Sequence, residues 1–79
     1  MSTAAHVDVI ASRGTAGEQE PSVILLNGER LEVLGIDDRW YDPSNRYFRV
    51  AASDGYIYLL RFDAEHCAWS IVHSWRLDA

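Results

Sequence analysis

Residues 23–34 read VILLNGERLEVL, and this stretch decides the fold. Two runs of strand-forming residues flank the pair Asn27-Gly28, which supplies the two positive φ values of a type I′ hairpin turn. Pairing across a two-residue turn places Ile24 opposite Leu31, so apolar side chains gather on one face of the hairpin. The stretch therefore predicts two antiparallel strands joined by a tight turn.

A second hairpin is predicted where residues 46–52 and 56–62 flank Ser53-Asp54-Gly55. The length of its turn decides which side chains point inward, because a slip of one residue turns one strand over relative to the other. A two-residue turn would mix charged and apolar side chains on both faces. We favour a three-residue turn with Gly55 in the left-handed region, because burying an unpaired arginine costs several kcal/mol.

The favoured register sorts this hairpin into two faces. The uncharged face, expected to be buried, holds Phe48, Val50, Ala52, Tyr56, Tyr58, Leu60 and Phe62. The opposite face holds Tyr47, Arg49, Ala51, Ile57, Leu59 and Arg61. We expect both arginines to reach solvent. Side by side in water, Ile57 and Leu59 would each forgo roughly 1.5–3 kcal/mol of burial, so either the N-terminal segment or another chain should cover them.

The remaining strand signals are weaker. Residues 6–12 and 68–75 carry alternating apolar side chains, and Gly35 sits where the alternation of the first hairpin slips, which indicates a bulge or bend. Together the segments predict one all-β domain spanning residues 1–79. We expect a small antiparallel meander of five or six strands, curled as an SH3-like barrel or a strongly bent sheet.

Polar stretches predict the connections. Residues 14–22 contain two glycines and a proline and are predicted to form a flexible loop, and residues 1–6 a flexible tail. Residues 37–45 are rich in turn-forming side chains, so Trp40 and Tyr41 are placed in a connection between strands.

The composition bears on the cellular compartment and on stability. Cys67 is the only cysteine in 79 residues, so an internal disulfide is impossible and a single reduced thiol fits the cytoplasm. The first residues lack the pattern of a secretory signal, and the longest apolar run, residues 23–26, is far short of the roughly 20 residues of a membrane span. A domain this small without disulfides needs an idealised core, a metal or association with another chain.

The charge is acidic overall, with 12 acidic residues, 7 arginines, no lysine and a net charge of −5. Arginine codons are rich in G and C, whereas lysine codons are not. The use of arginine at all seven of these basic positions therefore suggests a bacterial source with a GC-rich genome. Because nucleic-acid binding rests mainly on clustered cations, the net charge argues against a phosphate-backbone partner.

The run Arg46-Tyr47-Phe48-Arg49-Val50, followed by Asp54-Gly55, Tyr58-Leu59-Leu60 and Trp69, resembles a family of short bacterial domains of unknown function. The outer elements of the family pattern match Arg39-Trp40 and Trp69-Ser70-Ile71. Family members are often encoded near genes for translesion DNA polymerases, so the resemblance implies an accessory role in error-prone repair. The family has no established catalytic residues, and the resemblance assigns none here.

Few residues suggest catalysis or metal binding. The densest polar cluster is Asp63, Glu65, His66 and Cys67, with His73 nearby in sequence. Neighbours on a strand point to opposite faces and no C-x₂-C pair is present, so we interpret the cluster as a loop with a semi-buried cysteine rather than as a zinc site.

The other patterns are weaker still. A Cys–His nucleophilic pair, Cys67 with His6 or His73, lacks an orienting acid and an oxyanion hole. The G-x-x-G at residues 14–17 lacks flanking cations and a following helix. We therefore predict no catalytic residue, metal site or cofactor.

The turn-favouring aspartates Asp37, Asp38, Asp42 and Asp54 could suggest a cation site. Aspartate is favoured in turns because it hydrogen-bonds its own backbone, and we assign all four this role.

Arginine and aromatic residues make the most suggestive group, because Trp, Tyr and Arg dominate protein-interface hot spots. The candidate binding surface consists of Arg39, Trp40, Tyr41, Arg46, Tyr47, Arg49, Ile57, Leu59 and Arg61. Alternatively, Trp40 and Tyr41 plug one end of a barrel while the arginines pair with local acids. The leading hypothesis is a non-catalytic protein-interaction or accessory module that binds another protein or associates with a second copy of itself. The runner-up is a single-stranded nucleic-acid binder acting in DNA repair, with stacked bases and arginine-held phosphates.

Overall fold

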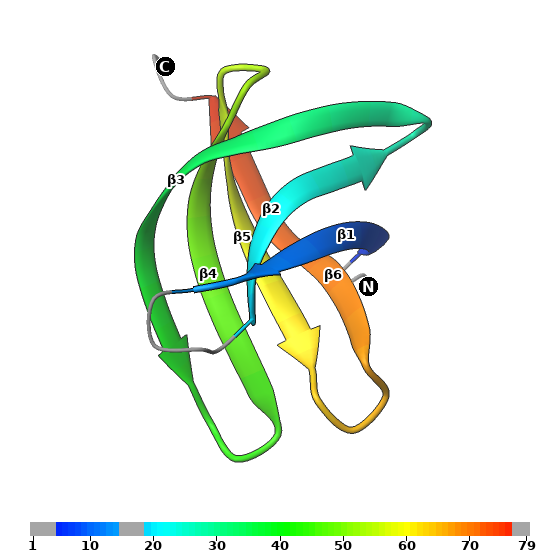
Figure 1. The fold of residues 1–79 in the computed structure, drawn as a ribbon, viewed down its shortest axis with the longest axis vertical. Helices are drawn as coiled ribbons and strands as arrows, with labels where there is room; N and C mark the ends of the chain where they lie inside the picture. The colour runs from blue at the N-terminus through cyan, green and yellow to red at the C-terminus, as the bar shows by residue number, and fades with distance from the viewer. Residues whose placement is uncertain (1–4, 15–18, 77–79) are drawn as a thin grey trace.

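The computed structural model describes residues 5–14 and 19–76, with side chains from residue 7 onward. Six antiparallel strands follow one another around a closed barrel in chain order, and β1 returns to pair with β6 (Figure 1). The strands are β1 (Ala5–Arg13), β2 (Gln19–Leu26), β3 (Glu29–Tyr41), β4 (Asn45–Ala52), β5 (Tyr56–Asp63) and β6 (Ala68–Arg76). The predicted all-β meander and its small SH3-like barrel form are confirmed. None of the described residues forms a helix of the length and apolarity needed to cross a membrane.

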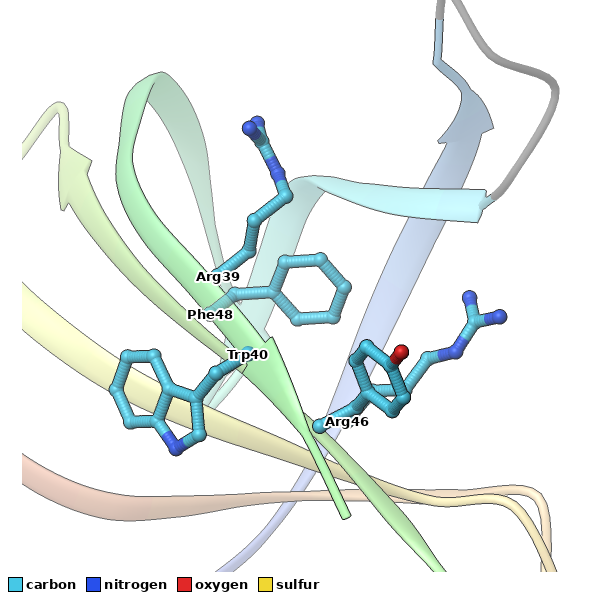
Figure 2. Close-up of a pocket in the computed structure, with 5 residues that line it drawn as sticks. Arg39, Trp40, Arg46 and Phe48 are labelled. Carbon is cyan, nitrogen blue, oxygen red and sulfur yellow. The ribbon is translucent and has the colours of Figure 1, made fainter. Parts of the chain in front are cut away.

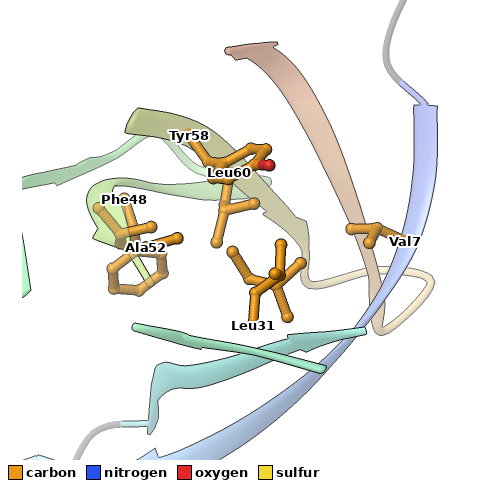
Figure 3. Close-up of a cluster of buried hydrophobic side chains, with 8 residues drawn as sticks. Val7, Leu31, Phe48, Ala52, Tyr58 and Leu60 are labelled. Carbon is orange, nitrogen blue, oxygen red and sulfur yellow. The ribbon is translucent and has the colours of Figure 1, made fainter. Parts of the chain in front are cut away.

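The barrel interior is apolar and draws on five of the strands (Figure 3). Its buried residues are Val7, Ile24, Leu31, Phe48, Val50, Ala52, Tyr58 and Leu60. Full burial of each large side chain stabilises the fold by roughly 1.5–3 kcal/mol. Since the inner face predicted for the second hairpin supplies five of these residues, the uncharged face is the core-facing one.

Both predicted hairpins are present. Asn27 and Gly28 have φ angles of 52° and 81°, both in the left-handed region that a type I′ turn requires. In the second hairpin, Ala51 pairs with Ile57 and the N–H of Gly55 donates to the carbonyl of Ala52 at 3.1 Å. Gly55 has a φ of 86°, so the three-residue turn and its register are confirmed.

β3 is longer than the sequence predicts. Residues 37–41 were assigned to a connection, but they continue β3 and pair with β4, and the turn itself begins at Asp42. The ladder shifts register at Gly35, as predicted, and again between Ile36 and Asp38. Such bulges bend a strand without ending it, and hydrogen bonding to β4 outweighs the turn preference of the aspartates.

The N-terminal predictions also need correction. β2 begins at Gln19, so the predicted loop ends earlier than residue 22, and residues 15–18 lie outside the described part of the chain. Pro21 is accommodated in β2 because the β1–β2 ladder shifts register beside its partner Ala11. Residues 5 and 6, assigned to a tail, belong to β1, whereas residues 1–4 are not described.

Candidate binding surfaces

Cross-strand pairing arranges the outward side chains of β3 to β6 in three rows, which we call the outer face. The first row is Trp40, Tyr47 and Arg61, the second is Arg49, Leu59 and His73, and the third is Ala51, Ile57 and Trp75. Directly paired residues of antiparallel strands point to the same side of the sheet, so each row is a set of neighbours. Six of the nine predicted surface residues lie on this face.

Two aromatic pairs border the outer face. Trp40 and Tyr47 stack with ring centroids 5.5 Å apart and planes 8° from parallel. His73 and Trp75 lie 5.3 Å apart between centroids. Trp40 keeps 43% of its surface exposed and Trp75 keeps 38%, so the rings remain accessible. Leu59 lies on β5, between the strands that carry Tyr47 and His73, and it pairs directly with His73. The aromatic rings thus offer flat apolar faces, and the indole N–H, hydroxyl and imidazole groups at their edges can form hydrogen bonds.

The two arginines of the outer face differ in their surroundings. Arg49 Nε lies 3.7 Å from Asp37 Oδ2, with 43% of the arginine side chain exposed. Arg61 sits between Tyr47 and Ser70, and its Nε is buried without a hydrogen-bond partner among the described residues. Arg49 thus reaches solvent as predicted, whereas Arg61 does so only in part because its neighbours cover the guanidinium's inner nitrogen.

Ile57 was expected to need cover from the N-terminal segment or another chain, and this expectation is wrong. It is only 5% exposed within the chain itself. Its cross-strand neighbours on the outer face are Ala51 and Trp75, so the row itself shields it. β1 lies in the barrel wall, between β2 and β6, rather than over the outer face. Leu59, half-buried, remains the accessible aliphatic residue of the pair.

His73 and Trp75 are members of the outer face that sequence reasoning missed. Simple alternation along β6 places them on the same side as Trp69 and Ile71. In the structure, Leu60 pairs with Ile71, while the preceding residue of β5, Leu59, pairs with His73. Val72 is therefore the extra residue of a bulge, and it sends the two C-terminal rings outward. No glycine or proline marks this position in the sequence.

The other predicted surface residues line a separate pocket at one end of the barrel. A cavity of about 490 Å³ is bounded by Arg39, Trp40, Tyr41, Arg46 and Phe48. Arg39 pairs with Phe48, and Tyr41 with Arg46, across β3 and β4. In Figure 2, Arg39, Arg46 and Phe48 extend to one side of these strands and Trp40 to the other. The structure thus divides the predicted surface between the outer face and this end pocket.

The plug interpretation of Trp40 and Tyr41 is not supported, since Trp40 is 43% and Tyr41 80% exposed. The arginines pair with local acids only in part. Arg39 Nε lies 3.2 Å from Glu20 Oε2, which links the ends of β3 and β2. Arg46 and Arg61 pair with no carboxylate in the part of the chain that the structure describes.

Two of the four aspartates organise turns as predicted. Asp42 Oδ1 accepts hydrogen bonds from the backbone N–H groups of Ser44 and Asn45, which lowers the pKa of Asp42. Asp54 Oδ1 accepts from the N–H of Tyr56, and its Oδ2 accepts from the Tyr58 hydroxyl at 2.6 Å.

Asp37 and Asp38 were assigned to a turn, but both lie on β3. Asp37 forms an ion pair with Arg49, and the side chain of Asp38 accepts the N–H of Arg39.

The β5–β6 connection brings together Asp63, Glu65 and His66, whose oxygen and nitrogen ligand atoms lie within 4.8 Å of one another. Their bonds are those of a turn: Asp63 accepts the N–H groups of Glu65 and His66, and its Oδ2 lies 2.8 Å from His66 Nδ1. The imidazole lowers the pKa of Asp63.

Cys67 is exposed rather than semi-buried and does not join this cluster. His73, also considered with it, lies on the outer face. The side chain of His6 and most of the G-x-x-G segment lie outside the described residues.

No family model, curated protein or solved structure matches this chain.

Proposed function

We propose that the chain is a non-catalytic protein-interaction module and that its outer face binds the partner. The observation that carries this proposal is the grouping of Trp40–Tyr47 and His73–Trp75 near half-buried Leu59. Exposed aromatic side chains with an adjoining arginine have the composition of interface hot spots. Such rings add large contact area at little cost in side-chain entropy.

The chemistry of the partner surface follows from Arg61. This arginine is half-buried and carries a charge that no described carboxylate balances. An aspartate or glutamate set in an apolar patch of the partner would satisfy it, because hydrogen bonds between guanidinium and carboxylate are among the strongest in proteins. A second copy of this acidic chain is one source of such a carboxylate.

The test is Leu59→Glu, with Leu34→Glu as the matched control. Leu34 is 70% exposed on β3 and lies outside the three rows, so it reports the cost of the same new charge elsewhere. We expect Leu59→Glu to abolish association, whether with a copy or with a captured partner, while the melting temperature stays near that of the control. Solution mass and quantitative capture measure the two forms of association.

Either of two results would count against the outer face as the interface. Association unchanged by Leu59→Glu would place the partner elsewhere. Unfolding by Leu59→Glu but not by Leu34→Glu would mean that Leu59 serves the fold.

One observation favours single-stranded nucleic acid as a second candidate partner, in line with the repair role that the family resemblance implies. The exposed face of the Trp40–Tyr47 stack suits a base, and unbalanced Arg46 suits a phosphate. The net charge of −5 opposes it. Oligonucleotide binding that weakens steeply between about 50 mM and about 200 mM salt would support this candidate over a protein partner.

We also propose that the module is cytoplasmic. An exposed, unpaired thiol at Cys67 supports a reducing compartment, because such a thiol is readily oxidised elsewhere.

A further inference from the structure

The pocket at the end of β3 and β4 has the size and lining of a ligand site. Its volume of about 490 Å³ falls within the roughly 300–1,000 Å³ of small-ligand pockets. Phe48, only 4% exposed, forms an apolar floor, and highly exposed Tyr41 stands at the rim. Arg39 and Arg46 extend to the same side of the strands as Phe48 (Figure 2). The pocket thus combines aromatic surface with two guanidinium groups.

Among the described residues that line this pocket or pair with its lining, one positive charge is left unbalanced. Glu20 offsets Arg39 through the 3.2 Å ion pair. Arg46 is exposed, and its side chain has no ion pair or hydrogen bond within residues 7–14 and 19–76. A planar guanidinium presents a fork of donors that matches a carboxylate in two-point contact.

We propose that this pocket binds a peptide carboxylate next to an apolar side chain, with the carboxylate on Arg46 and the apolar group against Phe48 and Tyr41. One unbalanced arginine matches a single negative charge. A phosphate monoester carries about −1.5 to −2 at neutral pH and would leave excess charge in a chain that is already acidic. The carboxylate comes from the C-terminus of the partner peptide or from an internal aspartate or glutamate.

This site does not rest on the proposed role of the outer face. Arg46 pairs with Tyr41 and Phe62, which lie outside the three rows, and Leu59 does not line the pocket. Only Trp40 belongs to both surfaces. Loss of binding at one surface is therefore separable from loss at the other.

The experiment titrates the intact chain with three short N-acetylated peptides, followed by calorimetry and by NMR of the arginine Nε–H groups. One peptide ends in leucine as a free acid, the second is its C-terminal amide, and the third is an amide with glutamate before the leucine. The variants are Arg46→Gln and the matched control Arg30→Gln, whose side chain is 61% exposed and does not line the pocket.

We expect the free acid or the glutamate peptide to bind, which identifies the source of the carboxylate, and the plain amide to bind at least about tenfold more weakly. Arg46→Gln should remove that preference, while Arg30→Gln and Leu59→Glu leave it intact. Equal binding of all three peptides, or no binding at millimolar concentration, overturns the proposal. So does tighter binding of phenyl phosphate than of the carboxylate peptides, or an unchanged preference in Arg46→Gln.

Discussion

Tyr58 joins the core to the second hairpin turn through one side chain. Its ring is buried beside Leu60 and Val50, and its hydroxyl donates a hydrogen bond to Asp54 Oδ2 at 2.6 Å. Burial and the adjacent carboxylate raise the pKa of Tyr58 above its usual value of 10.0, because both disfavour the phenolate. The native packing therefore favours the neutral phenol.

The stability of the fold should therefore fall at alkaline pH. Because the folded pKa of Tyr58 is raised, its contribution is fully present below the unfolded pKa of about 10 and is lost as pH rises above that value. Urea unfolding between neutral pH and pH 11 measures this loss. Tyr58→Phe should cost about 1 kcal/mol at neutral pH and flatten the alkaline decline. An equally steep decline in Tyr58→Phe would contradict this assignment.

At the scale of single elements, the two hairpins could be predicted because their signals are local. Asn27-Gly28 and Gly55 supply the backbone angles of their turns, and the cost of burying arginine selects the register of the second hairpin. The full length of β3 could not be predicted. Its end contains residues that favour turns when considered alone, and pairing with β4 overrides that preference.

The candidate site was only partly predictable for the same reason. Sequence composition identified Arg39, Arg46 and Tyr47 as surface residues, but their division between the end pocket and the outer face depends on which side of β3 and β4 each side chain occupies. The burial of Ile57 depends on a partner from β6, and the position of that partner depends on a bulge at Val72. Long-range pairing of this kind leaves no local pattern.

Deleting Val72 should be tolerated. Leu60 would still pair with Ile71 and Leu59 with His73, now in a regular ladder, so every side chain would keep its side of the sheet. We expect a change of less than about 1.5 kcal/mol in the free energy of unfolding.

Deleting Ser70 is the control for this experiment. It would turn Trp69 away from its aromatic contacts with Phe48 and Phe62, and should cost about 3–5 kcal/mol. Urea denaturation compares the two deletions, and equal losses would refute the bulge assignment.

For the molecule as a whole, closure of the barrel depends on a short seam. Within the described part of the chain, β1 pairs with β6 through residues 5–7 only, whereas residues 45–51 of β4 pair with residues 57–63 of β5. Val7 adds to this seam by entering the core, where it is 4% exposed. Apart from this seam the barrel is a continuous ladder in chain order.

Removal of residues 1–13 should therefore leave β2 and β6 as unpaired edges. Exposed edges template pairing with other chains, so the truncated protein should form dimers or larger assemblies that the intact chain does not form under the same conditions. Light scattering at several concentrations measures this. A synthetic peptide of residues 1–13 should reverse the effect by restoring the missing strand. A truncated chain with the same oligomeric state as the intact one would argue against a role of the seam in protecting these edges.

The seam also determines the order in which parts of the barrel fold. Its partners come from opposite ends of the chain, so forming it requires closing the longest loop in the molecule, and the entropy of that closure falls on the last step of folding. The two hairpins, with their neighbouring partners, are expected to form in the transition state before it. Substitutions in the seam would then speed unfolding and leave the folding rate almost unchanged. The lifetime of the native barrel is therefore set where β1 meets β6 rather than in its most buried strands.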